Sequence, residues 1–431
     1  GPDEGLNDGK GSGVIVTLWG QNLGSQQGDS DLLITDANGE THQAAHVYYW
    51  KNADGQLPSG PSNLYESHKM QEVAFSIPAA AEGPASISVS VDGRESNELG
   101  FTVREGNIYH VHQDGNDSGG DGSFENPWRT IAKADGTAPA GSTIYVHDVQ
   151  TGSESSARGI YWNNRDASST AEAPFSMIAY PGMRPTVVGQ RAIAAFKADG
   201  LMVSKLDIFA SNYSEVDSNG QPVGELIDSF SDTWGIKTTK DGRYIANRVG
   251  DIAGGCASNW NGAILGNSSG SLDRVSNVKM LGNEIYEYGC NGSSKLHHTT
   301  YMSIRSDRGR VVEPWEWGYN YFWGNKAKNG IHQWDKGETC GDISGPLKIY
   351  NNVIVDQGGA GITVGAANDC SWSMDVQIYN NVLIRPGLAA AWDGVDVDSS
   401  NGVTNGGINI LSGNNGLPGS VFIRNNYIYK P

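Results

Sequence analysis

One short pattern recurs along the chain and constrains its fold more than any other feature. Apolar residues alternate with other residues, an Asn or Gly and then an Asn follow, and a second apolar pair closes each copy. The copies lie within residues 244–249, 280–285, 317–322, 347–354, 376–384 and 421–428. Their alignment stacks six asparagines at intervals of 36, 37, 32, 29 and 45 residues: Asn247, Asn283, Asn320, Asn352, Asn381 and Asn426. Repeats of about 20 to 50 residues are typical of solenoids, in which each unit buries its apolar face against its neighbours.

The asparagine column itself has a structural explanation. An inward Asn at a tight corner can bond both its own turn and the Asn of the next coil, so a buried amide persists there. We therefore interpret the column as structural and expect no catalytic role for its members. The strands on either side should form long parallel sheets, with successive coils about 4.8 Å apart.

A second column precedes each copy and separates the inward from the outward face of the next strand. Its members are Gly235-Ile236, Gly262-Ala263, Thr299-Thr300, Gly330-Ile331, Gly361-Ile362 and Gly407-Ile408. Side chains alternate along a strand, so Thr300, Ile331 and Ile362 are expected to point inward. The expected outward rows are then Tyr301, His332 and Thr363, followed by Ser303, Trp334 and Gly365.

Composition narrows the class of protein. Glycine accounts for 58 of 431 residues and charged residues for 18%, which excludes a long helical or coiled-coil protein. No run of about 18 apolar residues occurs, so we expect no membrane span. With 48 acidic and 30 basic residues, the net charge of −18 has the wrong sign for binding nucleic acid. We expect a monomer.

The spacing of the four cysteines checks the alignment of the coils and indicates whether the protein occurs in an oxidising compartment. Cys256 and Cys290 follow successive column asparagines by nine and seven residues, and Cys340 and Cys370 follow Gly330 and Gly361 by ten and nine. Equivalent positions one coil apart can lie within the Cα separation of about 5.5 Å that a disulfide needs. We therefore predict the disulfides Cys256–Cys290 and Cys340–Cys370 and an oxidising compartment. The opening Gly1-Pro2 is typical of a protease scar, so we expect the trimmed mature chain of a secreted bacterial protein, extracellular or periplasmic.

The first quarter of the chain has a different residue pattern. Short runs of alternating apolar and polar residues are separated by Gly, Asp, Asn and Ser. Residues 17–24 (TLWGQNLG) and 98–103 (ELGFTV) resemble the first and last strands of immunoglobulin-like IPT/TIG modules. That resemblance implies an accessory β-sandwich domain over residues 5–104. Residues 108–146, with DGNDSGGDGS at 114–123 and NPWRTI at 126–131, resemble the N-terminal cap of secreted right-handed parallel β-helices. We expect an all-β protein whose second domain, residues 107–431, is a right-handed parallel β-helix.

The solenoid as a whole resembles the parallel β-helix carbohydrate-active enzymes: pectate lyases, the alginate lyase and chondroitinase B group, and β-helical fucan or carrageenan hydrolases. The alginate lyase and chondroitinase B group uses a Lys base and an Arg on neighbouring coils, with calcium nearby. Lys295 and Arg305 lie only ten residues apart, which is too short for one coil, so those roles are not transferred to them.

The expected site follows from three long insertions, residues 251–261, 284–298 and 383–406, which would form the walls of a groove. On its floor Tyr301 and His332 become neighbours, with His297, His298 and Lys295 just upstream of Tyr301 and Arg305 just downstream. A base, an acid and a cation are what β-elimination of a uronic acid polymer requires. We predict a polysaccharide lyase with His298 or His332 as base, Tyr301 as acid and a cation beside the substrate carboxylate. The residues expected to bind substrate are Trp260, Trp334, Trp392, His297, Asn259 and Lys237, the tryptophans because sugar faces stack on such rings.

Two other functions remain open. Hydrolysis needs two carboxyl groups about 5 to 9.5 Å apart, for which Asp335 could pair with Asp307, Asp393 or Glu287. A solenoid that binds glycans without cleaving them is the third possibility.

No cofactor is required by these chemistries, but Ca²⁺ is possible. Asp114, Asn116 and Glu125 match positions 1, 3 and 12 of a calcium loop, although no helices are expected to flank it. Asp121 lies in the same loop, and the acidic residues 393–398 form a second candidate.

Overall fold

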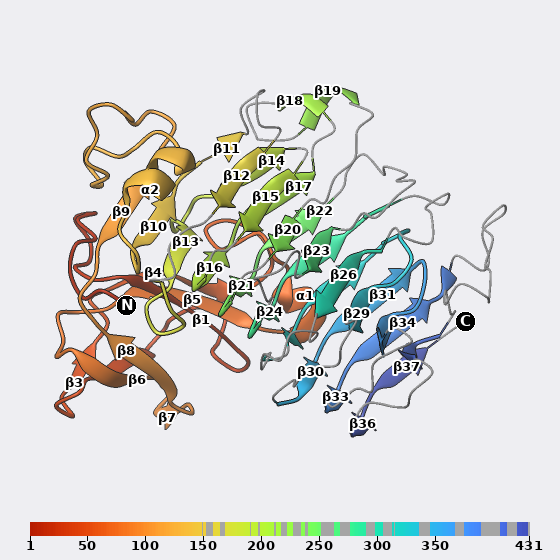
Figure 1. Ribbon diagram of the computed structural model, residues 1–431. Coiled ribbons are helices and arrows are strands. Elements are labelled where there is room, and N and C mark those ends of the chain that lie inside the picture. Colours follow the sequence, from red (N-terminus) through yellow and green to blue (C-terminus); the bar gives the residue numbers. More distant parts are fainter. Residues whose placement is uncertain are drawn as a thin grey trace. The chain divides into compact units, whose positions relative to one another are not determined.

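The computed structural model describes residues 1–148, 150–151, 158–163, 169–189, 191–196, 199–210, 213–216, 222–226, 234–237, 240–250, 263–267, 276–289, 298–304, 313, 315–335, 345–366, 375–388, 406–411 and 420–429. These residues form a chain that is almost entirely β. It divides into two compact units, whose helices and strands are shown in Figure 1. Unit 1 comprises Gly1–Gln150, Ser168–Pro185 and Gly200–Leu206, and unit 2 comprises Thr151–Ala167, Thr186–Asp199 and Asp207–Pro431. The domain boundary at residues 104–107 stays a prediction.

Unit 1 begins with two antiparallel sheets that share one apolar core. One sheet has the strand order β1-β5-β4, with β1 (Ile15–Gly20), β4 (His46–Asn52) and β5 (Gln71–Ser76). The other has the order β3-β2-β6-β7 with β8 also on β6, formed by β2 (Asp31–Thr35), β3 (Thr41–Gln43), β6 (Gly83–Val91), β7 (Arg94–Glu95) and β8 (Leu99–Val103). Alternate residues such as Leu18, Ile34, Phe75 and Val89 fill the shared core. Helix α1 (Leu64–His68) follows its N-cap Asn63. The immunoglobulin-like identity of this part stays a prediction.

Unit 1 also contains four parallel strands in the order β16-β13-β10-β9. They are β9 (Ile108–Val111), β10 (Thr143–Val146), β13 (Phe175–Ala179) and β16 (Leu201–Ser204). Helix α2 (Ile131–Thr137) begins at Thr130, whose side chain accepts a hydrogen bond from the Lys133 N–H. The Asp117 carboxylate in turn accepts hydrogen bonds from the N–H and hydroxyl of Thr130, which fixes the preceding loop against the helix.

A buried ion pair joins β5 to the residue that follows β16. Lys205, 2% exposed, lies with its Nζ 3.6 Å from Oε1 of Glu72, which is 1% exposed. The Lys205 ammonium donates a hydrogen bond to the Tyr49 hydroxyl at 2.6 Å, and that hydroxyl donates to Glu72 at 2.6 Å. Burial lowers the pKa of Lys205, while Glu72 opposes that change. Each charge is therefore tolerated only because the other is present.

We expect Lys205→Met to lower the free energy of unfolding of unit 1 by about 3 to 5 kcal/mol, because it leaves the Glu72 carboxylate buried without a cation. The double variant Lys205→Met/Glu72→Gln should recover much of that loss. The control is Lys51→Met, which removes the surface pair with Asp54 at 2.7 Å and should cost less than about 1 kcal/mol. Urea denaturation measures all three, and equal losses for the two single variants would refute the explanation.

Unit 2 is dominated by three parallel sheets. The first has the order β36-β33-β30-β27-β24-β21, with β21 (Arg243–Ile245), β24 (Lys279–Leu281), β27 (Glu316–Gly318), β30 (Leu347–Tyr350), β33 (Val376–Tyr379) and β36 (Val421–Arg424). The second has the order β14-β17-β22-β25-β28-β31-β34-β37, with β14 (Thr186–Gly189), β17 (Asp207–Ala210), β22 (Arg248–Gly250), β25 (Glu284–Tyr286), β28 (Tyr321–Trp323), β31 (Val353–Gln357), β34 (Val382–Pro386) and β37 (Tyr427–Tyr429). Strand β11 (Gln150–Thr151) spans the boundary between the units.

The third sheet carries the predicted site. Its order is β12-β15-β20-β23-β26-β29-β32-β35, with β12 (Arg158–Asn163), β15 (Arg191–Phe196), β20 (Trp234–Lys237), β23 (Ile264–Asn267), β26 (Thr300–Ile304), β29 (Ile331–Asp335), β32 (Ile362–Ala366) and β35 (Ile408–Leu411). A separate antiparallel pair consists of β18 (Tyr213–Val216) and β19 (Pro222–Leu226).

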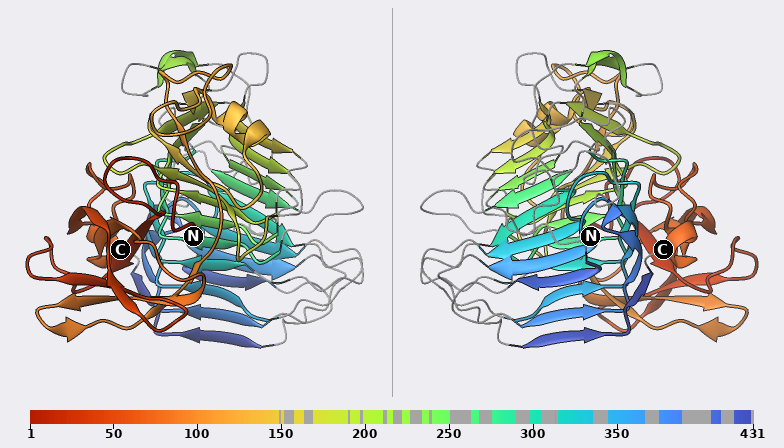
Figure 2. Two further views of the ribbon diagram at one scale, coloured as in Figure 1. Left: turned by 90° about the vertical axis from the view of Figure 1, so that its left-hand side faces the viewer. Right: turned by 90° about the vertical axis from the view of Figure 1, so that its right-hand side faces the viewer.

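From β21 onward the chain visits the three sheets in turn, so each circuit, here called a coil, adds one strand to each sheet. Figure 2 shows these strands stacked coil upon coil from green to blue. Inward side chains such as Met280, Ile285 and Phe322 are fully buried. The arrangement is compatible with a parallel β-helix.

The asparagine column is confirmed. Asn247, Asn283, Asn320 and Asn352 each donate their backbone N–H and their side-chain amide to Oδ1 of the next member, at 2.9–3.1 Å. Asn381 does the same to Asn426. The first five members are fully buried, so the ladder satisfies polar groups that water cannot reach.

The strand pairing predicted from the second column is confirmed in the later coils and wrong in the first two. The structure pairs Ile331 with Ile362 and Ile362 with Ile408, as predicted. Thr300, however, pairs with Ile264 rather than Ala263, and Ile236 pairs with Gly266 rather than Ala263. Glycine and alanine fit beside many neighbours, so the small residues of these two coils could not define the register.

Candidate functional site

One row of polar side chains crosses the third sheet of unit 2. The register pairs His332 with Thr363 and Thr363 with Asn409, and it places Tyr301 one strand before His332 because Met302 pairs with Gln333. We call Tyr301, His332, Thr363 and Asn409 the outer row. Their neighbours Thr300, Ile331 and Ile362 are fully buried on the opposite face of the strands, as the alternation predicts.

Three rings converge on His332, two from residues 298–304 and one from its own strand β29. The His332 ring centroid lies 5.0 Å from that of Tyr301 and 4.3 Å from that of His298, in both cases with the planes nearly perpendicular. His298 stacks on Tyr301 at 5.6 Å, and Trp334 approaches His332 edge-on at 5.8 Å. Tyr301 and His332 are neighbours with His298 beside them, as the alignment predicts, and Trp334 of the next outward row joins them. We call these four residues the His332 cluster.

The predicted exposure of this row is wrong. Tyr301 is 5% exposed, His332 is 7% exposed and Thr363 is fully buried, although the alternation places them on the outer face. The rings of the His332 cluster shield one another, because each covers part of its neighbour's surface. A low local dielectric follows, and it strengthens every electrostatic interaction at the site.

In the His332 cluster, the unusual polar atoms are the two imidazole nitrogens of His332. Its Nδ1 and Nε2 are both buried, and neither has a hydrogen-bond partner in the described part of the chain. Burial lowers the pKa of the imidazole from 6.5 to about 3, so the ring is neutral at ordinary pH. An unpaired buried polar group costs about 1–3 kcal/mol, and such groups commonly mark places where a ligand or water binds.

The neighbouring backbone fixes His298 and His332 in different ways. The Asn329 N–H donates to His298 Nδ1 at 3.4 Å, so the proton of a neutral His298 ring lies on Nε2. The Thr300 hydroxyl accepts from the His332 N–H at 3.3 Å and donates to the Gly330 carbonyl at 2.8 Å. Thr300 therefore positions the strand that presents His332, and His298 offers an N–H donor beside it.

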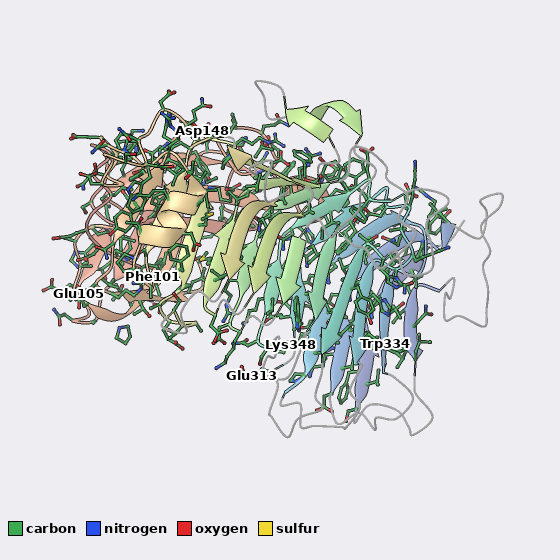
Figure 3. All side chains as sticks on the ribbon, turned by 45° about the horizontal axis from the view of Figure 1, so that its top comes forward. Phe101, Glu105, Asp148, Glu313, Trp334 and Lys348 are labelled. Atoms are coloured by element: carbon green, nitrogen blue, oxygen red, sulfur yellow. The ribbon has the colours of Figure 1, made fainter. Side chains whose placement is uncertain are left out.

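Trp334 differs from the large aromatics of the other two sheets. On those sheets Tyr286 leans over Gly250 and Tyr350 leans over Gly318, and a further ring stacks on each tyrosine. Trp334 leans over Gly365, where a Cβ atom would lie 2.4 Å from the indole, but no described ring stacks on it. Trp334 is also partly exposed. Figure 3 labels it on β29, on a different sheet from Lys348 of β30.

Many predicted site residues lie outside the described residues. They are Lys295, Arg305, His297, Trp260, Asn259, Trp392, Asp307 and Asp393, together with the acidic loop 393–398 and Cys256, Cys290, Cys340 and Cys370. Asp335 ends β29 and Lys237 ends β20, but their side chains are not among those described. The roles of all these residues stay predictions. Glu287 is exposed in the turn after β25, with a φ of 50°.

The predicted calcium loop is exposed at Asp114, Asn116, Asp121 and Glu125. Oδ1 of Asn116 accepts from the N–H groups of Ser118 and Gly119, and Oδ1 of Asp121 accepts from the Ser123 N–H. These oxygens therefore shape the turns of the loop. In the residues covered by the structure, the acidic and histidine side chains close enough to share an ion are Asp36, Glu40 and His42 in unit 1.

Sequence reasoning placed Thr363 in the outer row but assigned it no role. Its hydroxyl is fully buried and lacks a partner among the described residues, a property that depends on packing and has no sequence signal. Gln333, on the inward face, has both amide atoms buried and unpaired within the same described set.

None of the described helices is long and apolar enough to cross a membrane. Neither a model of a protein family nor a curated protein matches this chain.

Proposed function

We propose that the protein is a polysaccharide lyase that cleaves an acidic glycan by β-elimination on the third sheet of unit 2. One observation carries the proposal: the neutral imidazole of His332 is buried beside Tyr301, with no described partner on either nitrogen. A neutral imidazole next to a phenol supplies the base and the acid that elimination needs.

In the proposed reaction the glycan presents C5 of a uronic acid to His332. The imidazole removes the C5 proton, the electron pair of that C–H bond forms the C4–C5 double bond, and the C4–O bond breaks. Tyr301 gives its phenolic proton to the departing oxygen. Proton transfer from the imidazolium to the phenolate then restores both groups, whose ring centroids lie 5.0 Å apart.

Substrate binding assigns a further role to Trp334. Because the indole is partly exposed and borders His332, we propose that it moves aside to uncover the imidazole when substrate binds. A sugar ring could then stack on the indole face that no described ring covers. Arg305 and Lys295 remain the proposed neutralisers of the substrate carboxylate, and Trp260, Trp392, His297, Asn259 and Lys237 the proposed further contacts.

The proposal extends to the setting of the enzyme. We infer that an immunoglobulin-like accessory module is followed in the sequence by a right-handed parallel β-helix, in a secreted bacterial protein that acts as a monomer. The cysteine spacing supports two disulfides, and calcium is a proposed but unassigned ligand.

Incubation with polygalacturonate, alginate or chondroitin is expected to produce ultraviolet absorbance from the unsaturated uronate at the new end, in proportion to the reducing ends formed. Reducing ends without that absorbance would instead indicate hydrolysis by a carboxyl pair such as Asp335 with Asp307, Asp393 or Glu287. Binding without any shortening of the polymer would indicate a glycan-binding solenoid.

A further inference from the structure

Thr363 lies beside His332 and shares its unusual state. The two residues are register partners on β29 and β32, so their Cα atoms are about 4.8 Å apart on the same face. Thr363 is fully buried, and its Oγ1 lacks a hydrogen-bond partner among the residues that the structure describes. Two adjacent side chains thus hold three buried polar atoms in need of partners: Nδ1 and Nε2 of His332 and Oγ1 of Thr363.

Packing alone does not explain a threonine at this position. Valine has nearly the same shape, and it would remove an unpaired hydroxyl that costs about 1–3 kcal/mol when buried. Thr363 is itself fully buried, so an apolar side chain of the same shape would suit the position. A bound ligand that forms a hydrogen bond with this hydroxyl would explain why a threonine is present.

The chemistry of the pair specifies that partner. A neutral imidazole carries one proton, so one nitrogen can donate a hydrogen bond while the other stays free to take up the C5 proton, and a threonine oxygen can accept a hydrogen bond. A single hydroxyl group serves both side chains at once, because it accepts from the imidazole N–H through its oxygen and donates to Oγ1 of Thr363 through its hydrogen. A carboxylate, sulfate, ether or ester oxygen has no hydrogen to donate to Oγ1.

We propose that Thr363 is a specificity-determining residue, whose hydroxyl binds together with His332 to one free ring hydroxyl of the glycan. This inference rests on the proposed function and deepens it. It means that the enzyme discriminates against sugars in which that hydroxyl is acetylated, methylated or sulfated, because substitution removes the hydrogen that the sugar oxygen would donate to the buried Oγ1 of Thr363.

The test compares wild type, Thr363→Val and Thr363→Ser on whichever of polygalacturonate, alginate and chondroitin is cleaved fastest, before and after chemical O-acetylation. Thr363→Val is expected to lower kcat/KM on the free polymer about 10-fold, the effect of one lost hydrogen bond. It should also reduce the preference for the free over the acetylated polymer. Thr363→Ser, which keeps the hydroxyl, should stay within about threefold of wild type. The melting temperature of Thr363→Val should equal or exceed that of wild type.

The outcomes separate the two proposals. If wild type cleaves a polymer and Thr363→Val keeps both its kcat/KM and its preference for the free form, the role of Thr363 is refuted while the lyase stands. If wild type binds a polymer without cleaving it, the lyase fails, and a 10-fold weaker Kd for Thr363→Val in affinity electrophoresis would still support the Thr363 contact. If wild type neither binds nor cleaves any of the three, both proposals fail.

Discussion

Replacing His332 with glutamine is expected to lower kcat for uronate polymers by about 100-fold or more, because general base catalysis contributes about 10²- to 10⁴-fold. Glutamine retains a polar side chain of similar reach but cannot take up a proton at ordinary pH. KM should change far less than kcat, since the proton transfer occurs only in the transition state. Stopped assays of ultraviolet absorbance measure both parameters.

The control for this variant is His42→Gln in unit 1, where His42 pairs with Asp36 at 3.0 Å and lies in β3. It should leave kcat unchanged. Circular dichroism shows whether His332→Gln keeps the β-rich fold. A folded His332→Gln protein with wild-type kcat would eliminate His332 as the base and leave His298 as the candidate.

The pH profile gives a second signature of the same residue. The acid limb of kcat/KM reports the pKa of the free enzyme's base, and burial lowers the pKa of His332 to about 3. The active form is the neutral one, so activity is retained as the pH falls from 7 through 6.5 and is lost only as the pH approaches the lowered pKa. An acid limb near pH 6.5 would instead point to a solvated histidine.

How much of this site followed from sequence can be read from particular residues. The asparagine column and the outer row were predictable, because the recurring pattern around each asparagine and the strict alternation along strands are visible in the sequence. The register prediction failed at Ile236 and Ala263, because the preceding Gly235 and Gly262 and the small Ala263 fit beside many partners. Burial also failed: Tyr301 and His332 point outward yet are almost covered, since coverage depends on side chains from other segments such as His298 and Trp334.

Contacts between residues that are distant in the sequence could not be predicted from it. Lys205 and Glu72 are 133 positions apart, with Glu72 in β5 and Lys205 just after β16 of another sheet, so no local pattern links them. Thr363 resembles any strand threonine until its hydroxyl is shown to be buried without a described partner. In both cases the key question is whether a buried polar group has a hydrogen-bond or ion-pair partner, and only the three-dimensional packing answers it.

The asparagine ladder leads to the largest expected effect on stability. Asn320 is fully buried, and its Oδ1 accepts from the backbone N–H and the side-chain amide of Asn283 at 3.0 and 3.1 Å. Its own amide donates to the Met280 carbonyl and to Oδ1 of Asn352, both at 2.9 Å. Alanine at this position removes all four bonds and leaves the buried Asn283 N–H without its acceptor.

Each buried group left unpaired costs about 1–3 kcal/mol, so Asn320→Ala should lower the free energy of unfolding by about 3 to 5 kcal/mol. The matched control is Asn426→Ala, which removes the same two accepted bonds from Asn381. Asn426 is partly exposed, so water can replace its oxygen and the loss should be less than half as large. Urea denaturation monitored by circular dichroism distinguishes them. Equal losses would mean that the ladder contributes only its turn geometry, because the Asn426 side chain makes three bonds against the four of Asn320 and the main difference between the two sites is access to water.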